Sequence, residues 1–206
     1  KQQRLYFITE NNKIVEYDAT KLFQQKIIDL PKTSFIECIC VREDHLVALT
    51  AQGEIMLCNV LTGMVEHSTK INHKNGTVFC TIVGLKDHLL VSGLNQKTET
   101  NCLLLYSASP LACLQDLDIS GMKYPLHKII SFNYFSMENV AILYKDTNSV
   151  LFLYAVNGST LRKVTEVKFN NSMLYDIFFY QNSIVCCGWE EDEYIQKVML
   201  NLITLD

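Results

Sequence analysis

The sequence predicts an all-β protein assembled from repeated four-stranded antiparallel sheets. Short apolar runs of five to eight residues, rich in Val, Ile, Leu, Phe, Tyr and Cys, alternate with turn-like segments along the 206 residues. Such runs favour strands, and few windows place apolar residues at the i, i+3, i+4 and i+7 positions of an amphipathic helix. In addition, one short phrase recurs along the chain at a nearly constant spacing.

The recurring phrase is an apolar run that ends in an aromatic residue or a substitute, followed by a polar residue and a turn. Its anchor residues recur every 41 to 48 residues, and they are Tyr17, Cys58, Tyr106, Tyr154 and Leu200. A period in the forties with four short strands per unit is typical of a propeller blade. A two-sheet sandwich would also contain many short strands, but the constant period and the repeated tyrosine favour blades.

The anchors divide the chain into repeats of one β-propeller segment spanning residues 1–206. The expected units are approximately residues 4–35, 36–76, 77–127, 128–172 and 173–206. The first unit lacks an opening strand and the last stops after its third, so about four to five blades are represented. Because open sheet edges invite unwanted pairing, we expect a larger ring of about seven blades, completed by additional segments or by a partner.

The second unit carries the clearest resemblance to a known family. Its segment Leu49–Gly63 resembles the third strand and following turn of a WD40 repeat, with Cys58–Asn59 at the position of the family's Trp-Asp pair. Two segments resemble the small-residue end of the family's second strand, Val91–Gly93 and Cys186–Gly188. His73–Gly76 is similar to the family's Gly-His loop. The resemblance implies a degenerate WD40-like propeller that lacks the Trp-Asp dipeptide.

Charge and composition argue against several classes of protein. The net charge is −4, and the 18 Lys and Arg residues are scattered and outnumbered by 22 Asp and Glu, whereas nucleic-acid binders carry a basic face. No apolar run approaches the roughly 18–20 residues that span a bilayer. The eight cysteines lie mostly inside apolar runs, which indicates buried thiols in an intracellular compartment, cytoplasm or nucleus. Sequons at Asn75, Asn157 and Asn170 leave a secreted protein as the alternative.

No motif in the chain predicts catalysis. The sequence contains neither a phosphate-binding glycine loop nor a His-Glu-x-x-His pair. His45 and His88 each precede a second strand, which indicates a repeated turn position. Cys38 and Cys40 point to one face of a strand, but the adjacent Cys186–Cys187 pair points to opposite faces, so four ligands do not converge. We therefore expect no enzymatic activity, no cofactor and no metal.

The turns after strands two and four of a WD40-like blade emerge on one face. Two of these turns, Gln96–Thr100 and the acidic run Glu190–Glu193, are longer than a tight turn requires. Insertions gathered on one face of a repeat array often mark its binding surface. Trp189 immediately precedes an acidic run and is either an interface anchor or a core residue capped by solvated charges. The predicted partner-binding residues are Trp189, Glu190, Glu191, Asp192, Glu193, Gln96, Lys97 and Glu99.

These features favour a non-catalytic protein–protein interaction scaffold, a propeller domain within a multiprotein complex. One alternative is a propeller subunit associated with nucleic acid or anionic lipid, which would need a basic cluster that only the fold assembles. A second alternative is an enzyme whose site lies at the mouth of the central channel.

Overall fold

The structure, a computed structural model, describes residues 4–21, 23–28, 30, 35–42, 44–73, 76–119, 126–134, 136–145, 148–169, 172–192 and 195–204. In this part of the chain, eighteen strands form five antiparallel sheets. The expected all-β fold class with four-stranded antiparallel blades is confirmed. Three sheets have four strands, and the first and last have three each among the described residues.

In every sheet, strands that follow one another in sequence are paired. The first sheet contains β1 (Arg4–Ile8), β2 (Ile14–Asp18) and β3 (Phe23–Ile28). The second contains β4 (Ile36–Arg42), β5 (His45–Thr50), β6 (Glu54–Asn59) and β7 (Val65–Lys70). The third contains β8 (Thr77–Gly84), β9 (His88–Asn95), β10 (Thr100–Ala108) and β11 (Leu111–Ile119). The fourth contains β12 (Lys128–Tyr134), β13 (Met137–Lys145), β14 (Ser149–Asn157) and β15 (Thr160–Phe169), and the fifth β16 (Ser172–Tyr180), β17 (Ser183–Asp192) and β18 (Ile195–Thr204).

The anchor residues of the recurring phrase mark a β-bulge. In each of the first four sheets, the pairing between the third and fourth strands of the repeat shifts register immediately before the anchor. The four anchors concerned are Tyr17, Cys58, Tyr106 and Tyr154. Because a bulge strengthens the local twist of a strand, it turns the outer strand of each sheet in the same way. The sequence period is therefore the period of one structural irregularity.

In the first two units, the polar residue after the anchor caps the next turn. The Asp18 carboxylate accepts hydrogen bonds from the backbone N–H groups of Thr20 (2.8 Å) and Lys21 (3.1 Å). The Asn59 side-chain oxygen accepts the equivalent bonds from Leu61 (2.9 Å) and Thr62 (3.1 Å). Asp and Asn side chains favour such turns because they satisfy backbone donors two and three residues ahead. This explains why a polar residue follows the apolar run.

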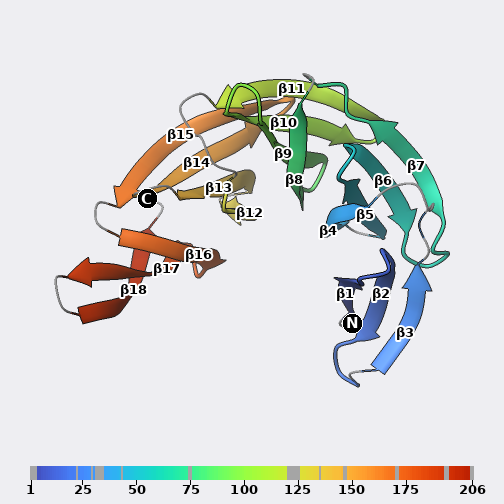
Figure 1. Cartoon of the computed structure of the whole chain (residues 1–206), viewed down its shortest axis with the longest axis horizontal. Helices are drawn as coiled ribbons and strands as arrows, with labels where there is room; N and C mark the ends of the chain where they lie inside the picture. Colours follow the sequence, from blue (N-terminus) through green and yellow to red (C-terminus); the bar gives the residue numbers. More distant parts are fainter. Residues whose placement is uncertain are drawn as a thin grey trace.

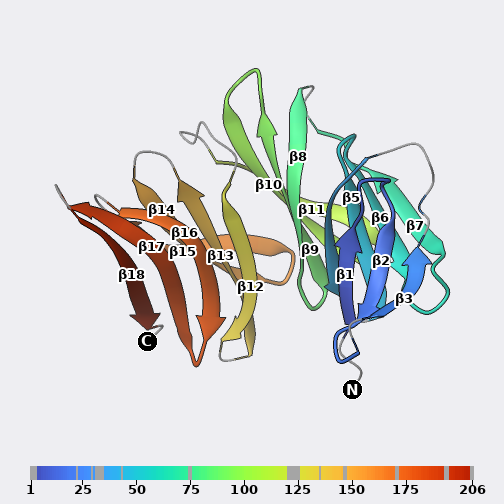
Figure 2. The same cartoon turned by 60° about the horizontal axis from the view of Figure 1, so that its bottom comes forward.

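The five sheets form an open arc (Figure 1). The first strands of the repeats lie on the inside, where β8 contacts both β4 and β12, and β12 contacts β16. The fourth strands β7, β11 and β15 lie on the outside. The sheets follow one another in chain order, with β1–β3 at one end and β16–β18 at the other (Figure 2).

Apolar packing between successive sheets forms four cores, one at each junction. Leu46 on β5 packs toward the first sheet, whereas the next residue, Val47, packs toward the third, as strand alternation requires. Leu89, Val140 and Ile184 occupy the matching second strands, and all three are fully buried. Burying one such side chain contributes about 1.5–3 kcal/mol, so each junction is held mainly by the hydrophobic effect.

Two glycines permit close approach of the first strand in their sheets. A Cβ atom at Gly188 would lie 2.3 Å from the carbonyl oxygen of Met173 and 2.8 Å from Cα of Leu174. At Gly93 the nearest atom, on Thr77, would lie 2.9 Å away. Both glycines lie beside a bulge in the first strand, so the small-residue end of the second strand has a steric cause.

Replacing Gly188 with alanine is expected to lower the free energy of unfolding by about 1–3 kcal/mol, because backbone atoms cannot move aside for the new methyl group. Gly84→Ala is the matched control, since a Cβ there would have its nearest neighbour at an ordinary 3.4 Å. Urea denaturation of both variants measures the difference. Equal midpoints for the two variants would contradict the steric explanation.

Candidate interaction site

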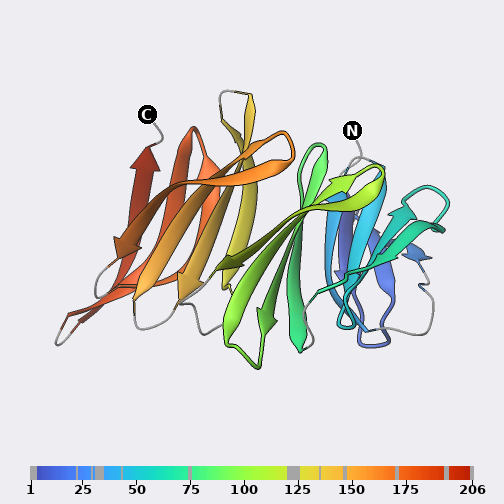
Figure 3. The ribbon, with the colours of Figure 1, turned by 90° about the horizontal axis from the view of Figure 1, so that it is seen from above.

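A cavity of about 300 Å³ lies on the face that carries the first-to-second turns of the blades. It opens between the inner strands of the second, third and fourth sheets. Its lining residues are Val41, Arg42, Gly84, Leu85, Lys86, Ser131, Phe132, Asn133 and Glu138. This face lies opposite the one on which the sequence places the partner-binding turns, as the view from above shows (Figure 3).

The turn between β8 and β9 lines the cavity, and Arg42 of the second sheet is hydrogen-bonded to it. The Arg42 guanidinium donates from Nε to the carbonyl oxygens of Leu85 (3.2 Å) and Lys86 (2.9 Å). Its Nη2 donates to the Lys86 carbonyl at 2.5 Å. Arg42 is the last residue of β4, and its long side chain reaches from the second sheet to the third.

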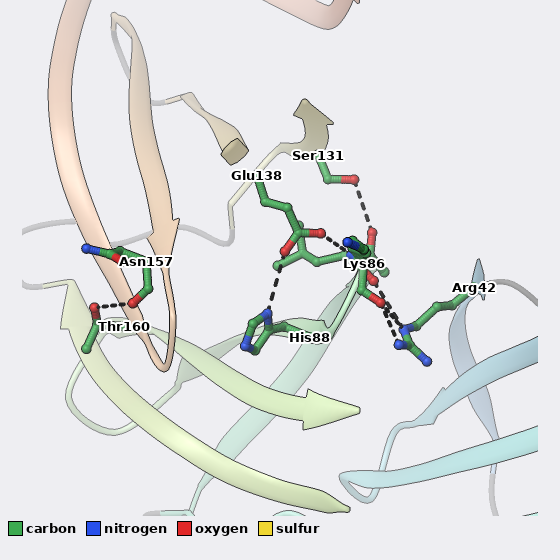
Figure 4. A network of polar contacts seen from close by, with 9 residues as sticks. Arg42, Lys86, His88, Ser131, Glu138, Asn157 and Thr160 are labelled. Atoms are coloured by element: carbon green, nitrogen blue, oxygen red, sulfur yellow. Dashed lines mark hydrogen bonds and ion pairs between the residues drawn. The ribbon is translucent and has the colours of Figure 1, made fainter. Parts of the chain in front are cut away.

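The fourth sheet holds the same turn from the other side (Figure 4). The backbone N–H of Lys86 donates to Glu138, and the Ser131 hydroxyl donates to the Gly84 carbonyl at 3.1 Å. Glu138 also lies 3.5 Å from Nδ1 of His88, which is close enough for attraction but outside hydrogen-bond geometry. The turn is therefore clamped between two neighbouring sheets by polar contacts that surround the cavity.

Nearby titratable groups are held in fixed states by their surroundings. Burial, and secondarily the neighbouring Cys38, raises the pKa of the Cys40 thiol on β4 to about 12, so this cysteine stays protonated. Away from the cavity, on the outer strand β7, Glu66 contacts His45 at 2.8 Å and accepts a hydrogen bond from Asn59 (2.8 Å), and these contacts hold the pKa of its carboxyl below the usual value. A protonated, buried thiol is a weak nucleophile.

The histidines follow the prediction of repeated turn positions. His45 begins β5 and His88 begins β9. The residue before each histidine accepts a backbone hydrogen bond. The Asp44 carbonyl accepts from the N–H of Val60 (3.0 Å), and the Asp87 carbonyl accepts from the N–H of Ala108 (3.1 Å). Within the described residues, no three His, Cys, Asp or Glu side chains are grouped so that they could hold a metal ion.

The predicted partner-binding residues of the third blade lie in an exposed turn. Gln96, Lys97 and Glu99 belong to the four-residue connection between β9 and β10. The backbone N–H of Gln96 donates to the Gly76 carbonyl at 3.1 Å, so this turn lies beside the connection from the second blade. Their role in binding remains a prediction.

The acidic run of the fifth blade is not the loop that the sequence suggested. Strand β17 continues to Asp192, with Glu190, Glu191 and Asp192 paired to Lys197, Gln196 and Ile195. Trp189 lies in the same strand between Met173 and Val198, and Glu193 is outside the described residues. The strand pairing therefore continues through the acidic residues. The two predicted segments share a face but belong to the third and fifth sheets, so they form no single patch.

Sequence reasoning missed the cavity because its residues come from three blades. One signal was present, since a basic residue precedes the histidine of the second strand in two units, at Arg42 and Lys86. Glu138 carries no comparable signal. Only the packing of successive sheets brings it within reach of residue 86, 52 positions earlier.

The architecture matches solved structures of one fold. The WD40 domain of Toxoplasma gondii coronin aligns with a TM-score of 0.69 at 14% identity, over 91% of this chain and 50% of that chain. The fold is that of a WD40-like β-propeller. The β-propeller domain of Cps50 (Swd1) from Myceliophteria thermophila aligns with a TM-score of 0.65 at 15% identity, over 90% of this chain and 62% of that chain.

A third propeller, BBS1N solved in complex with ARL6DN, aligns with a TM-score of 0.64 at 12% identity, over 99% of this chain and 62% of that chain. This WD40-like chain thus spans between half and about three fifths of the length of the three structures. No family model and no curated protein matches the sequence. Among the described residues no helix is long and apolar enough to span a membrane.

Arg42→Ala is expected to lower the free energy of unfolding by about 1–3 kcal/mol, because three inter-sheet hydrogen bonds from a charged donor are lost. Arg162→Ala removes an exposed arginine from the outer strand β15 and should change stability by less than about 0.5 kcal/mol. Chemical denaturation compares the two. An Arg42 variant as stable as the Arg162 variant would show that the turn needs no clamp.

Proposed function

We propose that this chain is a non-catalytic protein-interaction scaffold, a propeller domain that works within a multiprotein complex. The observation that carries the proposal is the apolar character of the two outward sheet faces at the ends of the arc. Of the 17 exposed large apolar side chains in the described residues, nine lie in the two end sheets. Exposed apolar patches of this kind are typical of interaction surfaces.

The face of the first sheet that points away from the second is continuous and apolar. Leu5 (42% exposed) and Phe7 (51% exposed) on β1 lie beside Val15 and Tyr17 on β2. These side chains line a shallow depression of about 420 Å³, and the rings of Phe7 and Tyr17 meet edge to face at 5.7 Å. A shallow, largely apolar surface of this type suits packing against the side chains of another sheet.

The fifth sheet presents a similar face at the other end of the arc. On β16, Ile177 packs against the fourth sheet, so its neighbour Phe178 (44% exposed) points outward, and so does Tyr180 (59% exposed). We propose that both faces are covered by β-strands that pack face to face, supplied by additional segments or by a partner protein. This arrangement would complete the expected ring and leave its turns free for other proteins.

The eight cysteines, none of which forms a disulfide, support an intracellular site of action, in the cytoplasm or the nucleus. The net charge of −4 supports protein partners rather than nucleic acid or anionic lipid. In the cavity, Glu138 and Ser131 are committed to hydrogen bonds between sheets, which supports a structural or binding role over acid–base chemistry.

The double substitution Phe7→Asp and Phe178→Asp tests the proposal. Affinity purification of the tagged chain from its source cells, with quantitative mass spectrometry, should recover its partners at least about tenfold less well, because each aromatic contributes about 2 kcal/mol on burial. Val164→Asp is the matched control, since Val164 is 62% exposed on the outer strand β15. Unchanged recovery of every partner by the double variant would refute the proposed use of these faces.

A further inference from the structure

Arg42 and Lys86 bring positive charge to the cavity between the second, third and fourth sheets, and neither forms an ion pair with a carboxylate of the described residues. The described ion pairs involve neither the Arg42 guanidinium nor the Lys86 ammonium. Arg42 donates hydrogen bonds from Nε and from Nη2 to backbone carbonyls, and a guanidinium has five N–H donors in all. Donors and charge therefore remain for a ligand, on a chain whose net charge is −4.

Two polar side chains of the fourth sheet at the cavity wall already contact the third sheet. One oxygen of Glu138 accepts the backbone N–H of Lys86, and the other faces His88. The Ser131 hydroxyl donates its proton to the Gly84 carbonyl. Arg42 and Lys86 add donors and positive charge to the same wall, which suits a ligand that carries acceptors. This complementarity indicates an anionic group.

The wall also limits the charge and the size of that group. The Glu138 carboxylate would repel a second negative charge, which favours a carboxylate over a phosphate dianion. About 300 Å³ lies at the lower limit for small-molecule sites and suits one or two side chains of a peptide. Val41, 52% exposed, lines the cavity, so an apolar side chain beside the carboxylate would find a partner at the rim.

We propose that this cavity binds an acidic segment of a partner protein, in which one Asp or Glu carboxylate lies between Arg42 and Lys86 and an apolar neighbour contacts Val41. The proposal rests on the function proposed above and assigns a second surface to it. The site lies on the opposite face from Gln96, Lys97 and Glu99, and it is separate from the apolar faces of the end sheets.

The test uses the 206-residue chain and immobilised pools of terminally blocked heptapeptides. Each pool has a fixed central residue (Glu, Gln, Lys or phosphoserine), apolar residues on both sides of it and mixed outer positions. The chain should bind the Glu pool about tenfold better than the Gln pool, because only the carboxylate forms a charge-assisted contact with both cations. Equal binding of the two pools, or stronger binding of the phosphoserine pool, would overturn the assignment.

Lys86→Glu should abolish the preference for the Glu pool, whereas Lys97→Glu, which makes the same charge change on an exposed turn of the opposite face, should preserve it. Arg42→Lys keeps the charge but loses the planar donor pair, so an intermediate preference is expected. Retention of the full preference by Lys86→Glu would overturn the site. Sodium acetate that binds as tightly as the peptides would assign the cavity to small carboxylates instead.

The pool experiment and the purification experiment fail independently. If the variants at Phe7 and Phe178 lose their partners while the pools bind equally, the scaffold function stands and the acidic-segment site falls. If those variants keep every partner while Lys86→Glu loses the Glu pool, the cavity stands and the end faces fall.

Discussion

A sheet in this chain has two faces and cannot bury either of them alone. Face-to-face apolar packing between successive sheets is therefore the interaction on which the rest of the structure depends. Leu46 and Val47, adjacent on one strand, belong to different cores, so the second sheet stabilises both of its neighbours at once. The same constraint explains the ends of the arc, where Phe7 and Phe178 have no sheet against them in the described part of the chain. The stability of the junctions and the exposure of the end faces thus have one physical origin.

Polar contacts add direction to this packing. The hydrophobic effect does not specify how far one sheet rotates against the next, whereas the contacts of the β8–β9 turn do. Arg42 reaches this turn from one side, and Ser131 and Glu138 reach it from the other, so three sheets are held in a fixed relation. The carboxylate of Glu138 accepts a hydrogen bond in this contact, and Arg42 and Lys86 add donors to the same cavity wall. The donors at the cavity wall follow from the way the sheets are joined.

The sequence predicted the fold well because its signals are local. An anchor such as Tyr17, its bulge and the capping residue Asp18 lie within one hairpin, and the second-strand glycine at position 188 meets its own sheet. The acidic run Glu190–Asp192 misled the prediction, since composition alone suggests a loop, whereas the ladder continues through it. The cavity was beyond reach for a different reason. Arg42, Lys86 and Glu138 are 44 and 52 residues apart, and only the packing of three blades brings them together.

Hydrogen–deuterium exchange of the 206-residue chain tests most directly whether neighbouring sheets stabilise one another. If they do, the strands β4–β15, covered on both faces, should exchange more slowly than β1–β3 and β16–β18, which are covered on one face. Protection should fall from the centre of the arc toward both ends. Uniform protection across all five sheets, or the strongest protection in an end sheet, would contradict the account.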